Sequence, residues 1–292
     1  MLSLPAEIRE EILDVVLCSD LDHVLTRSMS LVCRTFASSC QRRVFRVIHL
    51  SPRGRRSWVH NLNCLRSILQ ANPRLLEYTR ELCIAQHSDP WIVENSELLI
   101  DLLDLFCSES SPIHTLCFLL DKQIVWWELE GDLRQAFLNI FALPRLRNLS
   151  YSGLYLPYGF LSQFPHLNSL TLVAASSPSG IDRQIDPEAP SQPQRISQLR
   201  IICPGPISGR IALNEIGPQL GVDITQLRYL EIHISCPLHW FTRFFRLSRL
   251  PELKVSIISY ATTQNIHLIY PPWPSYPNSR YALSTSPTLE TI

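Results

Sequence analysis

The sequence predicts an α/β protein in which a small helical unit precedes a curved array of repeated strand–helix units. Two amphipathic stretches within residues 1–50 predict the helical unit, and a short apolar motif that recurs seven times predicts the array. Hydrophobic residues make up 46% and charged residues 18% of the 292 residues, so the chain can bury a core and is not disordered overall. The length allows one large domain or two ordinary ones.

The first amphipathic stretch is "LPAEIREEIL" at residues 4–13, which we expect to form a helix. Pro5 suits the first helical turn, where its missing N–H removes no hydrogen bond, and the charge of Glu7 favours the positive end of the helix dipole. Four apolar residues then mark one helical face: Ile8, Ile12, Leu13 and Val16. The charged residues at 7 and 9–11 stand where the apolar core of a signal peptide would lie, so we expect no such peptide.

The second amphipathic stretch is "VLTRSMSLVCRTFASSC" at residues 24–40. Its apolar side chains again share one helical face, and they are Leu25, Met29, Val32, Cys33, Phe36 and Cys40. The segment "QRRVFRVIHL" closes the unit, and we expect a short strand that ends at Leu50. A unit of this size buries little of its own apolar surface. Its two apolar stripes therefore need a partner, which is either the rest of the chain or another protein.

The residue pattern of these segments resembles the F-box, the motif of ubiquitin-ligase substrate adaptors, and is most similar to the F-box-like proteins of mushroom-forming fungi. The matching segments are "LPAEIREEIL", "MSLVCRTF" and "VFRVIHL". In that family the helices pack against a Skp-type adaptor, which connects the protein to a cullin scaffold. The resemblance implies that the adaptor contacts are Leu4, Pro5, Ile8, Ile12, Leu31, Val32, Cys33 and Phe36.

A weak repeat follows the basic, turn-like segment "SPRGRR" at residues 51–56. Each copy has an apolar residue, a leucine three positions later and another apolar residue two positions after that. The clear copies are "IHTLCF", "LRNLSY", "LNSLTL", "ISQLRI", "LRYLEI" and "LPELKV", and "YTRELCI" is an imperfect first copy. Their central leucines are Leu82, Leu116, Leu149, Leu170, Leu199, Leu230 and Leu253.

The spacing of these leucines favours one short strand per repeat, with helical stretches at 95–106, 127–144 and 239–251 between the strands. The layout resembles the repeat region that follows the F-box in fungal proteins of this type. The resemblance implies a helical, adaptor-binding F-box at residues 1–50 and a curved, irregular leucine-rich-repeat-like solenoid at residues 51–292. An ordinary α/β domain with parallel strands is the alternative. In a repeat array the exposed strand face is the natural binding surface.

Two segments do not carry the repeat. Residues 176–195, "SSPSGIDRQIDPEAPSQPQR", are rich in Pro and Ser and lack an apolar period, which predicts a flexible insertion. Residues 270–281, "YPPWPSYPNSRY", combine Pro with aromatic residues and predict a surface loop, with partner recognition as the alternative.

The sequence offers little for catalysis, so we expect neither an enzyme nor a cofactor. It has no GxSxG, HExxH, Walker or dinucleotide-binding motif, and its nine glycines disfavour a Gly-rich phosphate loop. In "HISCPLH", His233, Cys236 and His239 could ligate zinc, but structural sites normally need a fourth ligand and paired spacings. We therefore expect no metal there and interpret the segment as a strand end.

Charge and hydropathy limit the partners and the cellular compartment that we expect for this protein. The formal net charge is zero, which removes the usual electrostatic reason for binding nucleic acid or an anionic membrane. No apolar run approaches the roughly 18–20 residues that span a bilayer. The nine cysteines form no CxxC pair, as is typical of buried thiols in a reducing compartment. We expect a cytoplasmic or nuclear protein.

The resemblance implies a substrate-receptor subunit of a Skp–cullin–F-box ubiquitin ligase. Such a subunit docks on the adaptor through the F-box and binds a target protein, whose identity the sequence does not give, through the repeats. It acts by proximity, because it raises the effective concentration of target lysines near the transferred ubiquitin. The alternative is an adaptor-binding interaction protein that has no role in ubiquitination.

Overall fold

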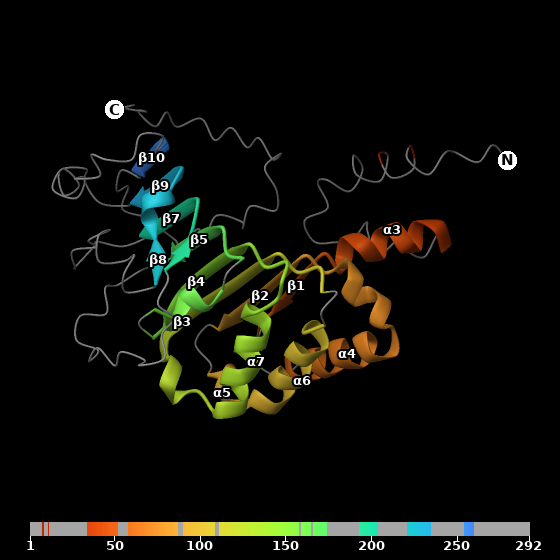
Figure 1. Ribbon diagram of the computed structural model, residues 1–292. Helices are drawn as coiled ribbons and strands as arrows, with labels where there is room; N and C mark the ends of the chain where they lie inside the picture. The colour runs from red at the N-terminus through yellow and green to blue at the C-terminus, as the bar shows by residue number, and fades with distance from the viewer. Residues whose placement is uncertain are drawn as a thin grey trace, which may run out of the picture. The chain divides into compact units, whose positions relative to one another are not determined.

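The computed structural model describes residues 8, 11, 34–51, 58–86, 90–108, 111–157, 159–164, 166–173, 193–203, 221–234 and 254–259. The chain divides into two compact units, Met1–Tyr155 and Leu156–Ile292, which we call unit 1 and unit 2 (Figure 1). Both units combine parallel strands with helical segments, which confirms the predicted α/β class.

Unit 1 contains four parallel strands that lie side by side in chain order. They are β1 (Val47–Leu50), β2 (Glu81–Gln86), β3 (Thr115–Val125) and β4 (Asn148–Tyr155). One register row of this sheet joins Ile48, Leu82, Leu116 and Leu149, and all four side chains are buried. Three of them are the central leucines of predicted repeats, so the motif marks equivalent positions on neighbouring strands.

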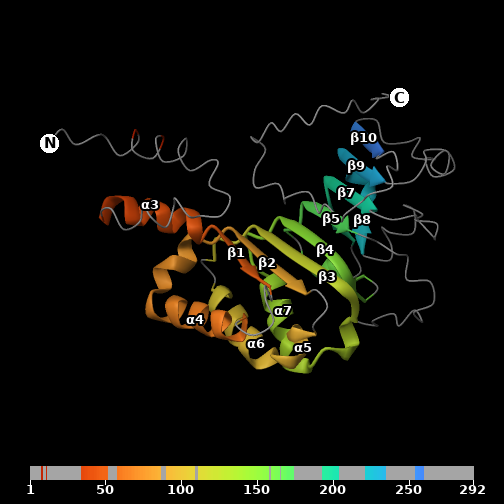
Figure 2. The same cartoon turned by 180° about the vertical axis from the view of Figure 1, so that it is seen from behind.

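The helical segments of unit 1 alternate with these strands along the chain. They are α3 (Arg34–Val44), α4 (Trp58–Ala71), η1 (Pro73–Tyr78), α5 (Trp91–Glu94), α6 (Ser96–Phe106), η2 (Trp126–Glu128) and α7 (Gly131–Phe141). Figures 1 and 2 show α4, α6 and α7 gathered on one face of the sheet. The predicted helices at 95–106 and 127–144 are therefore confirmed, with narrower bounds.

The core of unit 1 lies between these helices and the sheet. Phe118 of β3 packs against two rings of α7, with centroid distances of 5.2 Å to Phe137 and 5.7 Å to Phe141. The apolar face of α6 is buried along its whole length, through Leu98, Leu99, Leu102, Leu103 and Phe106. Burial of this stripe, rather than helix propensity alone, holds an 11-residue helix in place.

A bulge interrupts the pairing of β3 with β4. The register is regular up to Leu119 and Ser152 and resumes at Ile124 and Leu154. Gly153 lies inside this interval with φ of 67°, and a Cβ atom there would lie 2.3 Å from the carbonyl oxygen of Leu120. Only glycine fits this left-handed, closely packed position.

Unit 2 contains a second set of parallel strands in the order β5-β7-β9-β10. They are β5 (Ser169–Val173), β7 (Gln198–Cys203), β9 (Tyr229–Ile234) and β10 (Lys254–Ser259). A separate pair joins β6 (Gln194–Arg195) to β8 (Val222–Asp223), and two short 3-10 turns are η3 (Phe160–Gln163) and η4 (Ile224–Gln226).

The register of unit 2 corrects one detail of the predicted repeat. Leu170, Leu199 and Leu230 lie opposite one another, as equivalent repeat positions require. The next residue in this row is Val255, not the predicted centre Leu253. The predicted centre therefore lies two positions before the observed one. Leu250, Leu253 and Val255 match the motif, whereas the observed register puts Glu252 at its first, apolar position.

The end of the predicted insertion also needs correction. Gln194 and Arg195 form β6, and the amide of Gln194 donates to the carbonyl of Gly221 over 2.8 Å. The Nε2 of Gln194 also donates to the carbonyl of Leu167 over 2.9 Å. These two residues were assigned to the insertion because their strand partners lie far along the chain. Residues 176–192 lie outside the described residues.

The same hydrogen-bond arrangement recurs before successive strands. The carbonyl of Arg46 accepts from the amides of Arg80 and Glu81, and the carbonyl of Arg80 accepts from those of His114 and Thr115. The carbonyls of His114, Asn168 and Ser197 each accept from two amides of the next strand in the same way. The strands β2, β3, β4, β7 and β9 therefore enter their pairing through the same backbone geometry.

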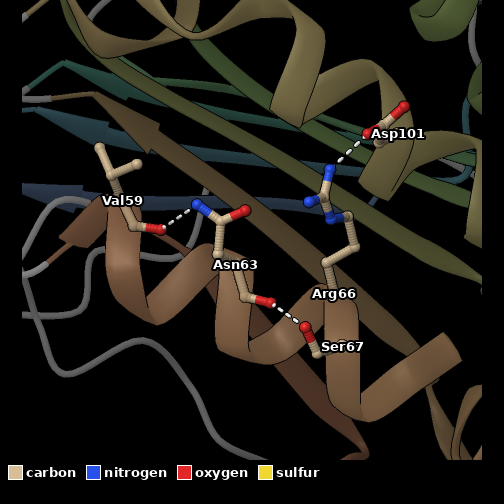
Figure 3. Close-up of polar contacts among 5 residues, drawn as sticks. All are labelled: Val59, Asn63, Arg66, Ser67 and Asp101. Carbon is tan, nitrogen blue, oxygen red and sulfur yellow. Dashed lines mark hydrogen bonds and ion pairs between the residues drawn. The ribbon is translucent and has the colours of Figure 1, made fainter. Parts of the chain in front are cut away.

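On the helical side of unit 1, α4 and α6 are joined by an ion pair between Arg66 and Asp101 (Figure 3). Within α4, Asn63 donates to the carbonyl of Val59 and Ser67 donates to that of Asn63. The sequence analysis did not assign α4, although Leu62, Leu65 and Leu69 follow a helical period. Of the helices in the described ranges, none has the length and apolar composition that a membrane span requires.

Candidate functional site on the polar strand faces

Side chains alternate between the two faces of a strand, so the residues between the buried leucines share the opposite face of each sheet. In unit 1 these residues are polar or small, and they lie in register across β2, β3 and β4. We define the polar strand face of unit 1 by Glu81, Cys83, Thr115, Cys117, Asn148 and Ser150. Cys83, Cys117 and Ser150 of this face are buried and the other three residues are half-buried, so it differs from the exposed strand face that a repeat array would offer to a partner.

Hydrogen bonds connect neighbouring strands along this face. The Nδ2 of Asn148 donates to the Oγ1 of Thr115 over 3.1 Å, and Thr115 also contacts the Nδ1 of His114 at 2.9 Å. The thiol of Cys117 points toward the Oε1 of Glu81, at 3.9 Å. The face is therefore held in a defined arrangement before any partner binds.

Burial lowers the chemical reactivity of the side chains on this face. A hydrogen bond with Cys83, then burial and the charge of Glu81, raise the pKa of Cys117 well above its ordinary value. Burial, followed by the neighbouring Cys83, raises the pKa of the Glu81 carboxyl, although His49 and Arg46 act against this shift. Because the thiolate is the nucleophilic form of cysteine, Cys117 is poorly suited to covalent catalysis.

One hydroxyl of the face lies without a hydrogen-bond partner among the described residues. Ser150 is buried, and its Oγ has no acceptor or donor within reach. A buried polar atom of this kind costs about 1–3 kcal/mol when it is left unsatisfied. The polar strand face of unit 1 therefore retains hydrogen-bonding capacity at Ser150.

The polar strand face of unit 2 carries charges instead. We define it by Arg200, Glu231 and His233, which project from β7 and β9 between the buried leucines. The Nε of Arg200 lies 3.3 Å from the Oε2 of Glu231, and the Nε2 of His233 contacts the Oε1 of the same carboxylate. The Nη2 of Arg200 is also 3.1 Å from the Nε2 of His233.

This cluster places one guanidinium and one imidazole beside the same carboxylate. The hydrogen bond from His233, together with the charge of Arg200, lowers the pKa of Glu231 despite partial burial, which acts in the opposite direction. The single Nε2 atom of His233 cannot donate to Glu231 and accept from Arg200 at the same time. Proton placement on this imidazole therefore decides which of the two neighbours it binds.

The predicted adaptor contacts lie mostly outside the described residues. The predicted contacts outside the described residues are Leu4, Pro5, Ile12, Leu31, Val32 and Cys33. Ile8 is described as helical, with 43% of its surface exposed, and Phe36 belongs to α3. The assignment of these residues to an adaptor interface stays a prediction.

Sequence reasoning flagged His233 only as a chance member of "HISCPLH" and did not identify its partners. Arg200 and His233 are 33 positions apart, and only the register of β7 with β9 brings them together. The alternation of charged and apolar residues in "QLRIIC" and "YLEIHI" was the available signal. Cys236 and His239 lie outside the described residues, and no group of three potential metal ligands occurs within them.

Comparison of the chain with protein-family models, curated proteins and solved structures finds no match.

Proposed function

We propose that this protein is a substrate-receptor subunit of a Skp–cullin–F-box ubiquitin ligase. In this proposal residues 1–50 form the F-box, and the strands of residues 51–292 form a curved, irregular leucine-rich-repeat-like array that holds the target. The protein itself performs no chemistry, because its contribution is to place the target near the transferred ubiquitin.

The observation that carries the proposal is the repeat of one leucine per parallel strand downstream of an F-box-like pattern. Leu82, Leu116 and Leu149 occupy one register row, and Leu170, Leu199 and Leu230 occupy another. Repeats of this kind leave the opposite strand face for recognition. The half-buried polar side chains on these faces are groups that can recognise a protein target, and they are Glu81, Thr115 and Asn148 in unit 1 and Arg200 and Glu231 in unit 2.

The raised thiol pKa values favour a binding function over an enzymatic one. Burial and the charge of Asp104 raise the pKa of Cys107 to about 12, and the pKa of Cys117 is also raised. Nucleophilic cysteines show the opposite shift. A cysteine-dependent transfer reaction is therefore disfavoured at both positions.

Binding to a purified Skp-type adaptor tests the F-box half of the proposal. We expect Ile12→Arg to weaken adaptor binding by at least about 2 kcal/mol, because it places a charge in a desolvated apolar contact. Ile68→Arg is the matched control, since Ile68 is 48% exposed on α4. Isothermal calorimetry on both variants gives the comparison, and equal affinities would show that residue 12 lies outside the interface.

A second candidate function is an adaptor-binding protein that recruits nothing for ubiquitination. The two functions differ in whether a cullin is present with the protein in cells. We expect affinity purification to recover both adaptor and cullin with the wild type, and neither with Ile12→Arg. Recovery of the adaptor without a cullin would favour the second function.

A further inference from the structure

A basic residue stands directly before each strand of unit 1. Because β1 to β4 begin in register at Val47, Glu81, Thr115 and Asn148, the residues one position earlier are neighbours at the same edge of the sheet. We call this set the basic row: Arg46, Arg80, His114 and Arg147. Adjacent strands in a sheet lie about 4.7–4.9 Å apart, so the four positions form a short, evenly spaced line.

The backbone fixes the basic row in place. The carbonyls of Arg46, Arg80 and His114 each accept hydrogen bonds from the amide of the next member and from the residue after it. Two of the side chains are also positioned alike, because Nη1 of Arg80 donates to the carbonyl of Glu77 and Nη1 of Arg147 to that of Pro144, each over 3.1 Å. These contacts orient the guanidinium groups of Arg80 and Arg147.

The edge around the basic row is more basic than the rest of unit 1. Arg46 and Arg147 are exposed, and three further exposed arginines lie in the segments that lead into the strands: Arg42, Arg74 and Arg145. In the described parts of these segments the acidic residues are Glu77 and, at the start of β2, Glu81. The Arg42 guanidinium lies over the ring of Tyr78, 5.7 Å from its centroid.

Acidic residues gather instead on the helices of unit 1 and their connections. They include Glu94, Glu97, Asp101, Asp104, Glu130 and Asp132, all of them exposed. The chain as a whole has a formal net charge of zero, so the positive edge is a local separation of charge. Such a separation steers and selects partners by complementarity.

The arginines of the basic row act on the histidine of the row. Burial lowers the pKa of His114, and the charges of Arg80 and Arg46 lower it further. An anion bound at this edge would offset the repulsion between these groups. The positions, exposure and shared orientation of the row therefore fit a negatively charged partner.

We propose that the basic row binds an acidic segment of a partner protein, which within the proposed function is the target. Arginine forks pair well with carboxylates, and a line of them across successive strands fits a segment with several acidic side chains. A nucleic acid fits less well. The Arg42 guanidinium lies over the Tyr78 ring, where a base could otherwise stack.

Fluorescence anisotropy with a labelled peptide of alternating Asp and Glu tests the proposal on the full chain. The neutral Asn/Gln version of the peptide and a single-stranded DNA oligonucleotide serve as comparison probes. The variant is Arg46→Glu/Arg147→Glu, and the control Arg134→Glu/Arg195→Glu makes the same change of charge on α7 and β6. Circular dichroism compares the folding of the two variants.

We expect the acidic peptide to bind the wild type and the control alike, and the basic-row variant at least about tenfold more weakly. The ring resonances of His114 should shift as the peptide is added to histidine-labelled wild type. Equal binding by both variants, absent binding to the wild type, or tighter binding of the oligonucleotide would each overturn the proposal. Adaptor affinity, measured with the same variants, reports separately on the proposed function, since residues 1–50 other than Arg46 are unchanged.

Discussion

At Gly153 a single missing side chain allows β3 and β4 to resume pairing after a bulge. Its φ of 67° and its contact with the backbone of Leu120 are both specific to glycine. Gly131, at the start of α7, has nothing within 4 Å of the place that a Cβ would take. Glycine is therefore required at position 153 and replaceable at position 131.

We expect Gly153→Ala to lower the free energy of unfolding by at least about 2 kcal/mol, because it combines a left-handed backbone with a clash. Gly131→Ala should leave stability unchanged or raise it by up to about 1 kcal/mol. Urea unfolding of the two variants gives the comparison. Similar losses in both would mean that the bulge relaxes to accept a side chain.

The carboxyls of Glu81 and Glu231 should affect stability in opposite directions. The pKa of Glu231 is lowered in the folded state, so its contribution is present above its unfolded value and is lost as pH falls through the folded pKa. The pKa of Glu81 is raised, so its charged form opposes folding at neutral pH, and the penalty disappears as pH falls. We expect Glu231→Gln to destabilise the protein at pH 7 and Glu81→Gln to stabilise it. Chemical denaturation at pH 7 and near pH 4 measures the change in unfolding free energy for each variant. A change of the same sign in both variants at pH 7 would contradict the opposite pKa shifts of the two carboxyls.

At the scale of elements, α6 is held by its buried face rather than by its ion pair. Leu102 is fully buried, whereas Asp101, which pairs with Arg66 of α4, keeps 54% of its side chain exposed (Figure 3). Exposed ion pairs contribute about 0–1 kcal/mol, whereas buried leucines contribute several times more. The helix therefore depends on its contact with the sheet.

We expect Leu102→Ala to cost about 2–5 kcal/mol and Arg66→Ala less than about 1 kcal/mol. Thermal unfolding of each variant measures the difference, and added salt should reduce only the effect of Arg66. A larger loss for Arg66→Ala would show that the ion pair, not the apolar face, positions α6.

The sequence predicted elements better than it predicted the site. Apolar periodicity identified α6, α7 and the positions of the strands, because each of these patterns lies within a short window. The Arg200–Glu231–His233 cluster and the basic row depend on register between strands, and no local pattern encodes register. The centre of the last repeat, predicted at Leu253 and observed at Val255, differs for the same reason, since "LPELKV" matches the motif locally and only the pairing with β9 gives the register.

At the scale of the whole molecule, the last two residues of the predicted insertion form a strand that pairs with another strand. Pairing of β6 with β8 links residues 194 and 195 to 222 and 223. The side chain of Gln194 also binds the carbonyl of Leu167. The insertion predicted at 176–195 therefore ends in two residues that form a strand of unit 2.

We expect replacement of residues 176–192 by a short Gly–Ser linker to leave the unfolding transition in place, because that segment has no apolar period. Extending the replacement through Arg195 should lower the transition midpoint, since it removes β6 and the contacts of Gln194. Calorimetry of the two replacement variants measures the difference in transition midpoint. Equal midpoints would show that β6 contributes nothing to stability.

The pairing of consecutive strands in unit 1 has a consequence for synthesis on the ribosome. The side chains of Thr115 and Asn148, which meet across β3 and β4, are 33 positions apart in the chain. At about 5–20 residues per second, translation supplies the next strand within a few seconds of the last. Each new strand can pair with the strand that was synthesised before it. The carbonyls of Arg46, Arg80 and His114 accept hydrogen bonds from amides that emerge later in synthesis. Unit 1 can therefore assemble from its first strand onward, and a chain interrupted at any point would present the edge of its latest strand.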